Sequence, residues 1–177
     1  GVELCISDNC STDATAKVLA NLKSKHRIRT RKNKTNLGVA KNVLEVVNMA
    51  RGEFVWLLGD DDLIMPGAIL RLLHILGSQD IHADFHYVNS CHLTTEYVRS
   101  YPQPFRLANL PQNMETFSAW KESGRYKFLE LVNPAISFDF MGGMFLAVFR
   151  RSLWIQARAA INLKNLDLKQ PNQQLDQ

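Results

Sequence analysis

The strongest constraint on the fold is an alternation of short apolar runs with longer segments of helical periodicity. Residues 2–7 form an apolar run that enters a cluster of turn-forming residues, and residues 54–58 form a second, continuous run. Between and after these runs, apolar side chains recur three or four positions apart, as on one face of an α-helix. This order is typical of an α/β fold whose sheet is mostly parallel and flanked by helices.

The same periodicities predict the individual elements. After the strand at 2–7, a helix ending near Lys25 begins at Ser11, Thr12 or Asp13, any of which could cap it. Residues 99–112 have no steady period and predict a long loop. The other predicted elements are an edge strand at 27–31, a helix from Gly38 to about Ala50, a strand at 54–58, a helix from Pro66, a strand at 83–88, a helix near 116–132, a strand at 144–149 and a short helix after Ser152.

Composition excludes several classes of protein. Of 177 residues, 46% are hydrophobic and 21% charged, which is ordinary for a globular domain. No segment approaches the roughly 20 apolar residues of a membrane span, and the N-terminus does not resemble a signal peptide. GxGxxG and GxxxxGK[ST] motifs are absent, which disfavours dinucleotide oxidoreductases and P-loop NTPases. Three cysteines without metal-ligand spacing indicate free thiols and the cytoplasm.

The formal net charge of +4 is unevenly distributed. Seven cationic residues fall within the twelve positions 23–34, and no acid occurs between Asp13 and Glu45. This basic stretch could be a solvated helix end and loop, or a surface attracted to anionic lipid or a phosphorylated ligand. Nucleic acid is disfavoured as a partner, because no aromatic residue is interleaved to stack on bases.

Three adjacent aspartates, Asp60, Asp61 and Asp62, follow the apolar run at 54–58. Neighbouring carboxylates repel one another unless a cation or strong hydrogen-bond donors lie among them. Ligands of open α/β sheets bind beyond the carboxyl ends of the strands, where this acidic run is expected. Carboxylates that hold Mn²⁺ or Mg²⁺ against substrate phosphates are one interpretation. The alternative is a helix cap by Asp62 with solvated neighbours, which explains one aspartate better than three.

Two further polar clusters follow predicted strands. The sequence DNCSTD, from Asp8 to Asp13, could cap the next helix or accept hydrogen bonds from a base or ribose. Asn36 and Gly38 precede the second helix, and Asn42 lies within it. Gly38 allows a tight turn or a close approach of the backbone to a ligand.

Together these motifs resemble the family-2 inverting glycosyltransferases, which have the GT-A fold. The resemblance is carried by DNCSTDAT and NLGVAKNVLEVVNMARGEFVWLLGDDD, and again by GGMFLAVFRRSLW. It covers residues 2–90 densely, with matching order and spacing. The GDDD variant and the FMGGMF segment suggest the branch that builds bacterial surface polysaccharides, including abequosyl-type transferases. Residues 1–165 would then form one domain, with a nucleotide-binding part at 1–99 and an acceptor-side part at 100–165, followed by a polar tail at 166–177.

The resemblance implies a role for each matching residue. Asp8 and Asn9 would lie beside the base and ribose, with Asn36, Gly38 and Asn42 shaping the nucleotide pocket. Asp60, Asp61 and Asp62 would face the diphosphate and its metal, with Gly142 and Gly143 on the acceptor side. The acceptor would be a lipid-linked or surface-polysaccharide glycan, which places the enzyme in the cytoplasm, possibly peripherally at the inner membrane.

The match also has departures. Gly59 stands where the common DxD pattern has its first aspartate, so Asp61 is the metal ligand that the motif best supports. The family's first strand has no counterpart, and no Glu-Asp pair follows the acceptor glycines, so both ends look truncated. An inverting transfer needs a carboxylate base, for which Asp139 is the nearest candidate, although an ordinary loop aspartate is the alternative. A nucleotidyltransferase, or a non-catalytic relative that binds nucleotide or membrane, are the rival functions.

Overall fold

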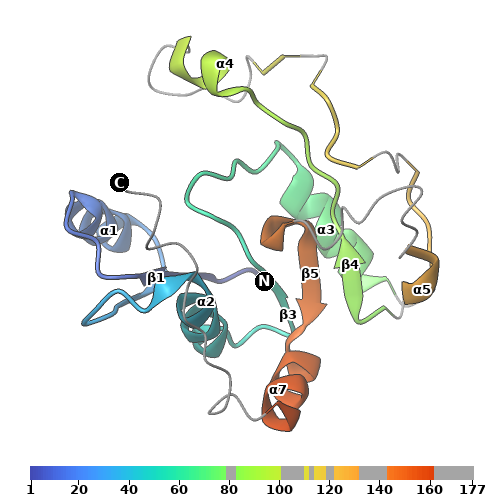
Figure 1. The fold of residues 1–177 in the computed structure, drawn as a ribbon, viewed down its shortest axis with the longest axis horizontal. Coiled ribbons are helices and arrows are strands. Elements are labelled where there is room, and N and C mark those ends of the chain that lie inside the picture. The colour runs from blue at the N-terminus through green and yellow to red at the C-terminus, as the bar shows by residue number, and fades with distance from the viewer. Residues whose placement is uncertain (79–82, 101–109, 112–113, 119–121, 132–142, 162–177) are drawn as a thin grey trace, which may run out of the picture. The chain divides into compact units, whose positions relative to one another are not determined.

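The computed structural model describes residues 1–78, 83–100, 110–111, 114–118, 122–131 and 143–161 (Figure 1). The chain forms two compact units, Gly1–Val55 with Arg150–Gln177 and Trp56–Phe149. The predicted base Asp139, the predicted glycine Gly142 and the polar tail at 166–177 lie outside the described residues.

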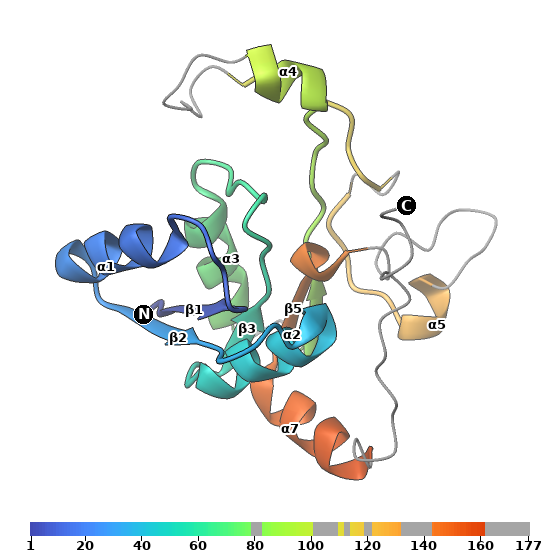
Figure 2. The ribbon, with the colours of Figure 1, turned by 60° about the vertical axis from the view of Figure 1, so that its left-hand side comes forward.

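The first unit is built on two parallel strands. β1 (Leu4–Asp8) pairs with β2 (Ile28–Lys32), and α1 (Thr15–Lys25) connects them, as the apolar periodicity predicts. Figure 2 shows the two strands side by side. The pairing is in register from Leu4 opposite Ile28 to Asp8 opposite Lys32, so both strands end at the same edge. α2 (Gly38–Met49) follows, and its Val47 is 2% exposed.

The first turn of α1 is stabilised by one of the three residues predicted to cap it. The Asp13 carboxylate accepts hydrogen bonds from the backbone N–H of Thr15, at 3.0 Å, and from its hydroxyl, at 2.6 Å. Ala14 occupies the cap position itself and makes no side-chain capping bond. The sequence therefore predicted the stabilising side chain, although the helix begins two residues later.

The turn that ends α2 is held from both sides. The Glu3 carboxylate, just before β1, accepts the backbone N–H groups of Arg51 and Gly52. From the other end of the chain, Arg151 donates its Nε to the Gly52 carbonyl oxygen at 2.9 Å and its backbone N–H to the Glu53 carbonyl oxygen at 2.8 Å. α7 (Arg151–Ala160) begins at this point. The segments ARGE and FRRS, which the sequence places about 100 residues apart, are thus bound to one another.

A three-stranded sheet has the order β3–β5–β4, with β3 at Phe54–Trp56, β4 at Phe85–Tyr87 and β5 at Ala147–Arg150. β4 and β5 are antiparallel, with Phe85 opposite Phe149, so this pair departs from the mostly parallel sheet that the sequence predicts. Val148 of β5 is 1% exposed, and the preceding Leu146 is fully buried. The indole N–H of Trp56 donates to the Phe145 carbonyl oxygen at 2.7 Å, which adds a polar link to this apolar core.

The remaining described elements are α3 (Ala68–Gly77), α4 (Thr95–Ser100), α5 (Phe128–Leu131) and the 3₁₀ turn η2 (Met144–Leu146). The strand predicted at 54–58 ends at Trp56, and Leu58 is already exposed. η2 occupies the first half of the strand predicted at 144–149. Gly67, with a φ of 79°, separates Pro66 from the start of α3, two residues later than predicted.

The helix predicted near 116–132 is wrong for most of its described length. Phe117 N–H donates to the Ser90 carbonyl oxygen at 2.7 Å, and His92 N–H donates to the Glu115 carbonyl oxygen at 2.9 Å. These bonds place the start of the predicted helix in an extended pairing around Cys91. Within the range 116–132, the described residues are helical only in α5. Long-range backbone pairing here overrides the local helical periodicity.

Candidate functional site

An amide network joins the end of β1, the end of β2 and the start of α2. Asn33 directly follows β2 and is 4% exposed. Its Nδ2 donates to Oδ1 of Asn9 at 3.1 Å and to Oδ1 of Asn42 at 2.9 Å. The Asn42 amide also accepts the Ser7 hydroxyl at 2.6 Å and donates to the Ser7 carbonyl oxygen at 3.2 Å. These bonds fix α2 against β1.

Asn9 and Asn36 extend the network to the loop before α2. Asn9 Nδ2 donates to Asn36 Oδ1 at 2.8 Å, while Asn9 Oδ1 accepts the Leu37 backbone N–H at 2.9 Å. Asn36 Oδ1 also accepts the Gly38 backbone N–H at 2.9 Å. Gly38 has a φ of 75°, a conformation that glycine adopts without the cost borne by other residues. The structure therefore brings Asn9, from the first predicted polar cluster, together with Asn36, Gly38 and Asn42 of the second.

Asp8, at the end of β1, supplies a buried charge beside this network. The residue is 4% exposed, and its Oδ1 accepts the Ser11 backbone N–H at 2.7 Å. Its Oδ2 lies 3.7 Å from the Lys32 ammonium nitrogen. The hydrogen bond from Ser11, and secondarily the charge of Lys32, lower the pKa of the Asp8 carboxyl. Asp8 is therefore an ionised hydrogen-bond acceptor at neutral pH.

The loop that follows Asp8 is bent by an unusual backbone conformation. Cys10 has a φ of 70°, in the left-handed region that residues other than glycine seldom adopt. Its Sγ lies 3.6 Å from the Lys34 carbonyl oxygen, so this bend brings the loops after β1 and β2 together. Strained conformations of this kind tend to occur at functional sites.

Sequence reasoning missed two members of the network, Asn33 and Ser7. Asn33 follows a run of basic residues, where an isolated asparagine indicates only a turn. The available signal was its position. Asn33 directly follows β2, just as Asn9 directly follows β1. The carboxyl ends of neighbouring parallel strands lie at one edge of a sheet, so the two residues are expected to lie close together.

The acidic run lies in the second unit, in the loop after β3. Asp60 and Asp61 are exposed, whereas Asp62 is half-buried and its Oδ2 accepts the Gly59 backbone N–H at 2.6 Å. A Cβ atom at Gly59 would lie 2.6 Å from Asp61 Oδ1 and 3.2 Å from Asp62 Oδ2. A glycine at the first position of the motif therefore gives both carboxylates room beside the backbone.

The chemistry of this loop suits a hard divalent cation. Mg²⁺ and Mn²⁺ prefer oxygen ligands, and in phosphate sites they take one or two carboxylates, with water and phosphate oxygens completing the shell. Asp61 and Asp62, whose carboxylate oxygens both lie beside Gly59, could supply such oxygens. Within the described part of the chain, no three His, Cys, Asp or Glu side chains converge as a complete metal cluster.

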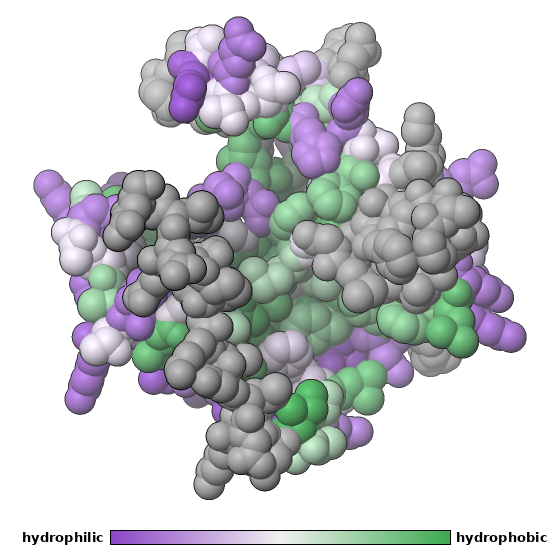
Figure 3. Space-filling model, in the orientation of Figure 1, coloured by the Kyte–Doolittle hydropathy of each residue, from purple (hydrophilic) through white to green (hydrophobic). Residues whose placement is uncertain are grey.

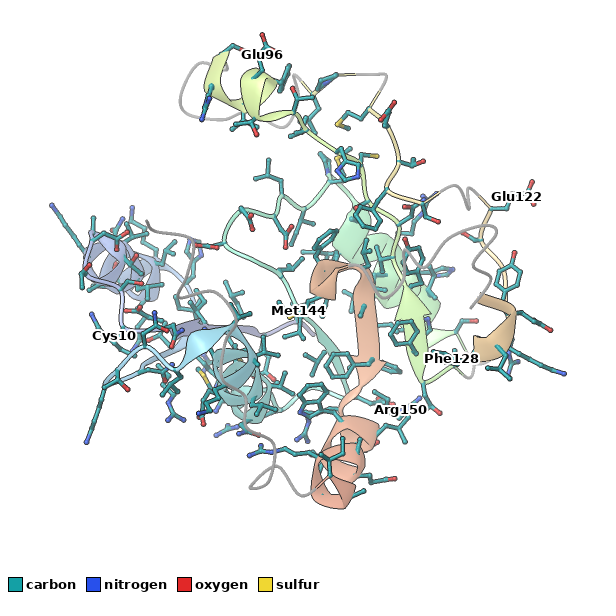
Figure 4. All side chains as sticks on the ribbon, in the orientation of Figure 1. Cys10, Glu96, Glu122, Phe128, Met144 and Arg150 are labelled. Carbon is teal, nitrogen blue, oxygen red and sulfur yellow. The ribbon has the colours of Figure 1, made fainter. Side chains whose placement is uncertain are left out.

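On the predicted acceptor side, the structure describes Gly143. A Cβ atom at this position would lie 2.6 Å from a carbon of the Phe145 ring. The ring in turn meets Phe117 edge to face, with centroids 5.8 Å apart. Figure 4 labels Met144, which lies between Gly143 and Phe145 in η2. The close contact with the Phe145 ring therefore explains why a residue without a side chain stands at position 143.

Ion pairs divide the basic stretch into two groups. Three of its cations are held by acids of the same unit: Arg29 by Glu3, Arg31 by Glu45 and Lys32 by Asp8. Within the described residues the other four make no salt bridge and are exposed: Lys23, Lys25, Arg27 and Lys34. Hydrophilic side chains project from the α1 region, at the left of Figure 3. None of the helices described is long and apolar enough to cross a membrane.

Two known proteins are similar in sequence to part of this chain. The chain is 36% identical over 80 residues to the abequosyltransferase RfbV of Salmonella typhimurium, a match that covers 44% of this chain and 24% of that protein. It is 32% identical over 84 residues to the uncharacterised protein y4gI of Sinorhizobium fredii, which covers 46% of this chain and 9% of that protein. These matches thus span a quarter or less of the relatives' lengths.

Solved structures show the same fold. Residues 1–349 of S. aureus TarS, in complex with UDP, superpose with a TM-score of 0.59 at 19% identity. This match covers 88% of the present chain and 39% of the TarS chain. A second crystal structure of S. aureus TarS 1–349 gives a TM-score of 0.60 at 20% identity, over 88% of the present chain and 40% of the TarS chain. The predicted GT-A-type α/β fold is confirmed. Glycosyl transferase family 2 matches residues 1–154, and the chain belongs to this family.

Proposed function

We propose that the protein transfers a sugar from a nucleoside diphosphate sugar to an acceptor hydroxyl, with inversion and with Mn²⁺ or Mg²⁺ bound. The observation that carries this proposal is the amide network. The family resemblance assigns Asn9, Asn36, Gly38 and Asn42 to the nucleotide pocket, and these residues are joined by hydrogen bonds after two strand ends. The resemblance also assigns Asp8 to the base and ribose, and its ionised carboxylate is adjacent to Asn9 of this network.

In the proposed reaction, the acceptor hydroxyl loses its proton to a carboxylate as its oxygen attacks the anomeric carbon. The bond between that carbon and the diphosphate oxygen breaks, and the nucleoside diphosphate leaves. A divalent cation, when bound, would neutralise charge that develops on the departing diphosphate. Asp60, Asp61 and Asp62 would hold the cation, and Asp139 is proposed as the base. Gly142 and Gly143 would border the acceptor.

A thermal-shift screen of nucleoside diphosphates tests the proposal directly. We expect one of them to raise the melting temperature when Mn²⁺ is present and not in a chelator. At a hundredfold excess over the dissociation constant, binding stabilises the folded state by about 2.7 kcal/mol. Equal stabilisation in chelator would remove the metal from the mechanism. Release of pyrophosphate from a nucleoside triphosphate would favour a nucleotidyltransferase, and binding without sugar transfer or hydrolysis would favour a non-catalytic relative.

The proposed acceptor is a lipid-linked or surface-polysaccharide glycan, which the similarity to an abequosyltransferase supports. Such an acceptor would require the enzyme to work in the cytoplasm beside an anionic membrane. The four cations without salt bridges suit that role better than the three that hold the fold. Each cation near an anionic surface contributes roughly 1 kcal/mol, and salt screens the attraction.

Sedimentation with anionic vesicles tests this part of the proposal. We expect the protein to bind at low salt and to be released at high salt. Changing Lys23, Lys25 and Arg27 to Gln should lower vesicle affinity roughly a hundredfold, at about 1 kcal/mol for each charge. A matched control changes three exposed cations elsewhere to Gln: Lys41, Arg71 and Arg99. Equal losses in both triple variants would show that net charge, and not this stretch, drives binding.

A further inference from the structure

We propose that Asn33 is a positioning residue of the nucleotide site, which holds Asn9 and Asn42 in their binding orientation. The inference rests on the proposed function, because a nucleoside diphosphate is the ligand concerned. Asn33 lies where β2 ends, and its single amide group bridges the loop after β1 to α2. No other described side chain bonds to both Asn9 and Asn42.

Backbone groups determine the direction of every bond that Asn33 makes. The Leu37 backbone N–H can only donate, so the Asn9 atom 2.9 Å from it is the oxygen. The Asn33 atom 3.1 Å from that oxygen is then the amide nitrogen. At the other end, the Ser7 carbonyl can only accept, so the Asn42 atom facing it is nitrogen and the Asn42 oxygen faces Asn33. Both hydrogens of the Asn33 amide are thereby committed.

The other half of the Asn33 amide indicates how this residue can act on a ligand. Its Oδ1 is buried and accepts no hydrogen bond in the structure. Because this oxygen is buried, Asn33 acts on a ligand through Asn9 and Asn42 rather than by touching it. An aspartate would have the same shape but no hydrogen to donate to either neighbour.

The loss of Asn33 has a defined consequence. Asn9 would keep one backbone bond but could rotate, and its bond to Asn36 would weaken as a result. The N–H groups of Leu37 and Gly38, which now donate to these two side chains, would exchange with solvent more readily. A site that must order itself on binding has a lower affinity than one already ordered. The diphosphate half of the ligand, bound through the metal, would be unaffected.

The test compares wild type, Asn33→Asp and Asn33→Ala, with the exposed Asn21→Asp as a matched control. Isothermal titration measures affinity for UDP and for inorganic pyrophosphate, each with Mn²⁺. We expect both Asn33 variants to bind UDP at least tenfold more weakly, to bind pyrophosphate within about twofold of wild type, and to exchange the Leu37 and Gly38 amides faster. Asn21→Asp should match wild type in all three measurements.

Two results would overturn the inference. One is unchanged UDP affinity or unchanged amide exchange at Leu37 and Gly38 in both Asn33 variants. The other is a purely structural role for Asn33. It would show as an equal loss of UDP and pyrophosphate binding in both variants, or as a failure of both variants to fold. If wild type binds neither ligand, UDP is not the nucleotide of this site, and the exchange measurement still decides whether Asn33 positions the loop.

Discussion

The two polar regions that follow strands in this protein are organised in opposite ways. After β1 and β2, the side chains of Asn9, Asn33 and Asn42 are bound to one another and to the backbone before any ligand arrives. After β3, Asp60 and Asp61 are exposed. Amides carry both donors and acceptors and can satisfy one another, whereas carboxylates can only accept and repel. The first region is therefore built by folding, and we expect the second to be completed by a cation.

The substitution Asp61→Asn should show the largest difference between the acidic run and the amide network. Asp61→Asn removes the proposed metal ligand while keeping its shape, so we expect metal-dependent nucleotide binding to disappear. The stabilisation of about 2.7 kcal/mol at a hundredfold ligand excess would be lost with it. In metal-free buffer the melting temperature should stay unchanged or rise, because one repelling charge is gone. Thermal shift with and without Mn²⁺ measures both effects.

The exposed Glu122, changed to Gln, provides the same charge change elsewhere in the second unit as a control. If Asp61→Asn binds nucleotide with Mn²⁺ as wild type does, the acidic run is not the metal site. A large loss of stability without metal would instead show that the Asp61 carboxylate stabilises the fold of this loop.

A change within the amide network should do the reverse and reduce stability directly. Asn42→Ala leaves the Ser7 hydroxyl, the Ser7 carbonyl and one Asn33 hydrogen without their partner. Loss of a partner by buried polar groups costs about 1–3 kcal/mol, slightly offset by the higher helix propensity of alanine. We expect the free energy of unfolding in urea to fall by about 2 kcal/mol.

Lys41→Ala, one position earlier on the exposed side of α2, should change the free energy of unfolding by less than about 0.5 kcal/mol. Equal small effects of the two substitutions would mean that the network contributes little to folding, and the contrast between the two regions would fail.

The sequence predicted the elements better than it predicted the site's internal contacts. Helical spacing of apolar residues located α1, α2 and α3, because this period can be read from neighbouring residues alone. The helix near 116–132 failed since residues 115–117 pair with residues 90–92, a long-range contact that no local period encodes. Asn33 was missed for the same reason: its partners lie 24 and 9 residues away. By contrast, the aspartates at 60–62 were noticed because the feature is contiguous.

Stability at low pH should also distinguish the two regions, because Asp8 lies beside the amide network and its charge stabilises the fold. Because the Ser11 hydrogen bond and Lys32 lower the Asp8 pKa, its ionised form stabilises the folded state above its ordinary pKa of about 4. This contribution is lost as the pH falls through the lowered folded-state pKa. We expect Asp8→Asn to be less stable than wild type at pH 7, with the difference shrinking toward pH 3.

Urea unfolding at a series of pH values measures that difference. Glu3 and Asp13 also have lowered pKa values, through backbone bonds from Arg51 and a side-chain bond from Thr15 respectively, so wild type and variant will both weaken in acid. The informative quantity is the gap between the two curves. A gap that is constant with pH would show that the Asp8 charge does not stabilise the fold.

The smallest expected effect concerns Asp62, where the two regions are most alike. This carboxylate is the member of the acidic run whose hydrogen bond to the backbone is described, the one from Gly59 N–H. Asp62 does not cap α3, because Gly67 occupies the cap position and no side chain caps that helix. If the bond from Gly59 N–H orders the loop, Asp62→Ala should cost about 1–2 kcal/mol while Asp62→Asn, which keeps an acceptor oxygen, should cost little. However, Gly59 is exposed, so water can replace the lost acceptor, and removal of a charge relieves repulsion from Asp60 and Asp61. We therefore expect both variants to lie within about 0.5 kcal/mol of wild type in metal-free urea unfolding. A loss of 2 kcal/mol or more in Asp62→Ala alone would show that this loop, like the amide network, is ordered by folding.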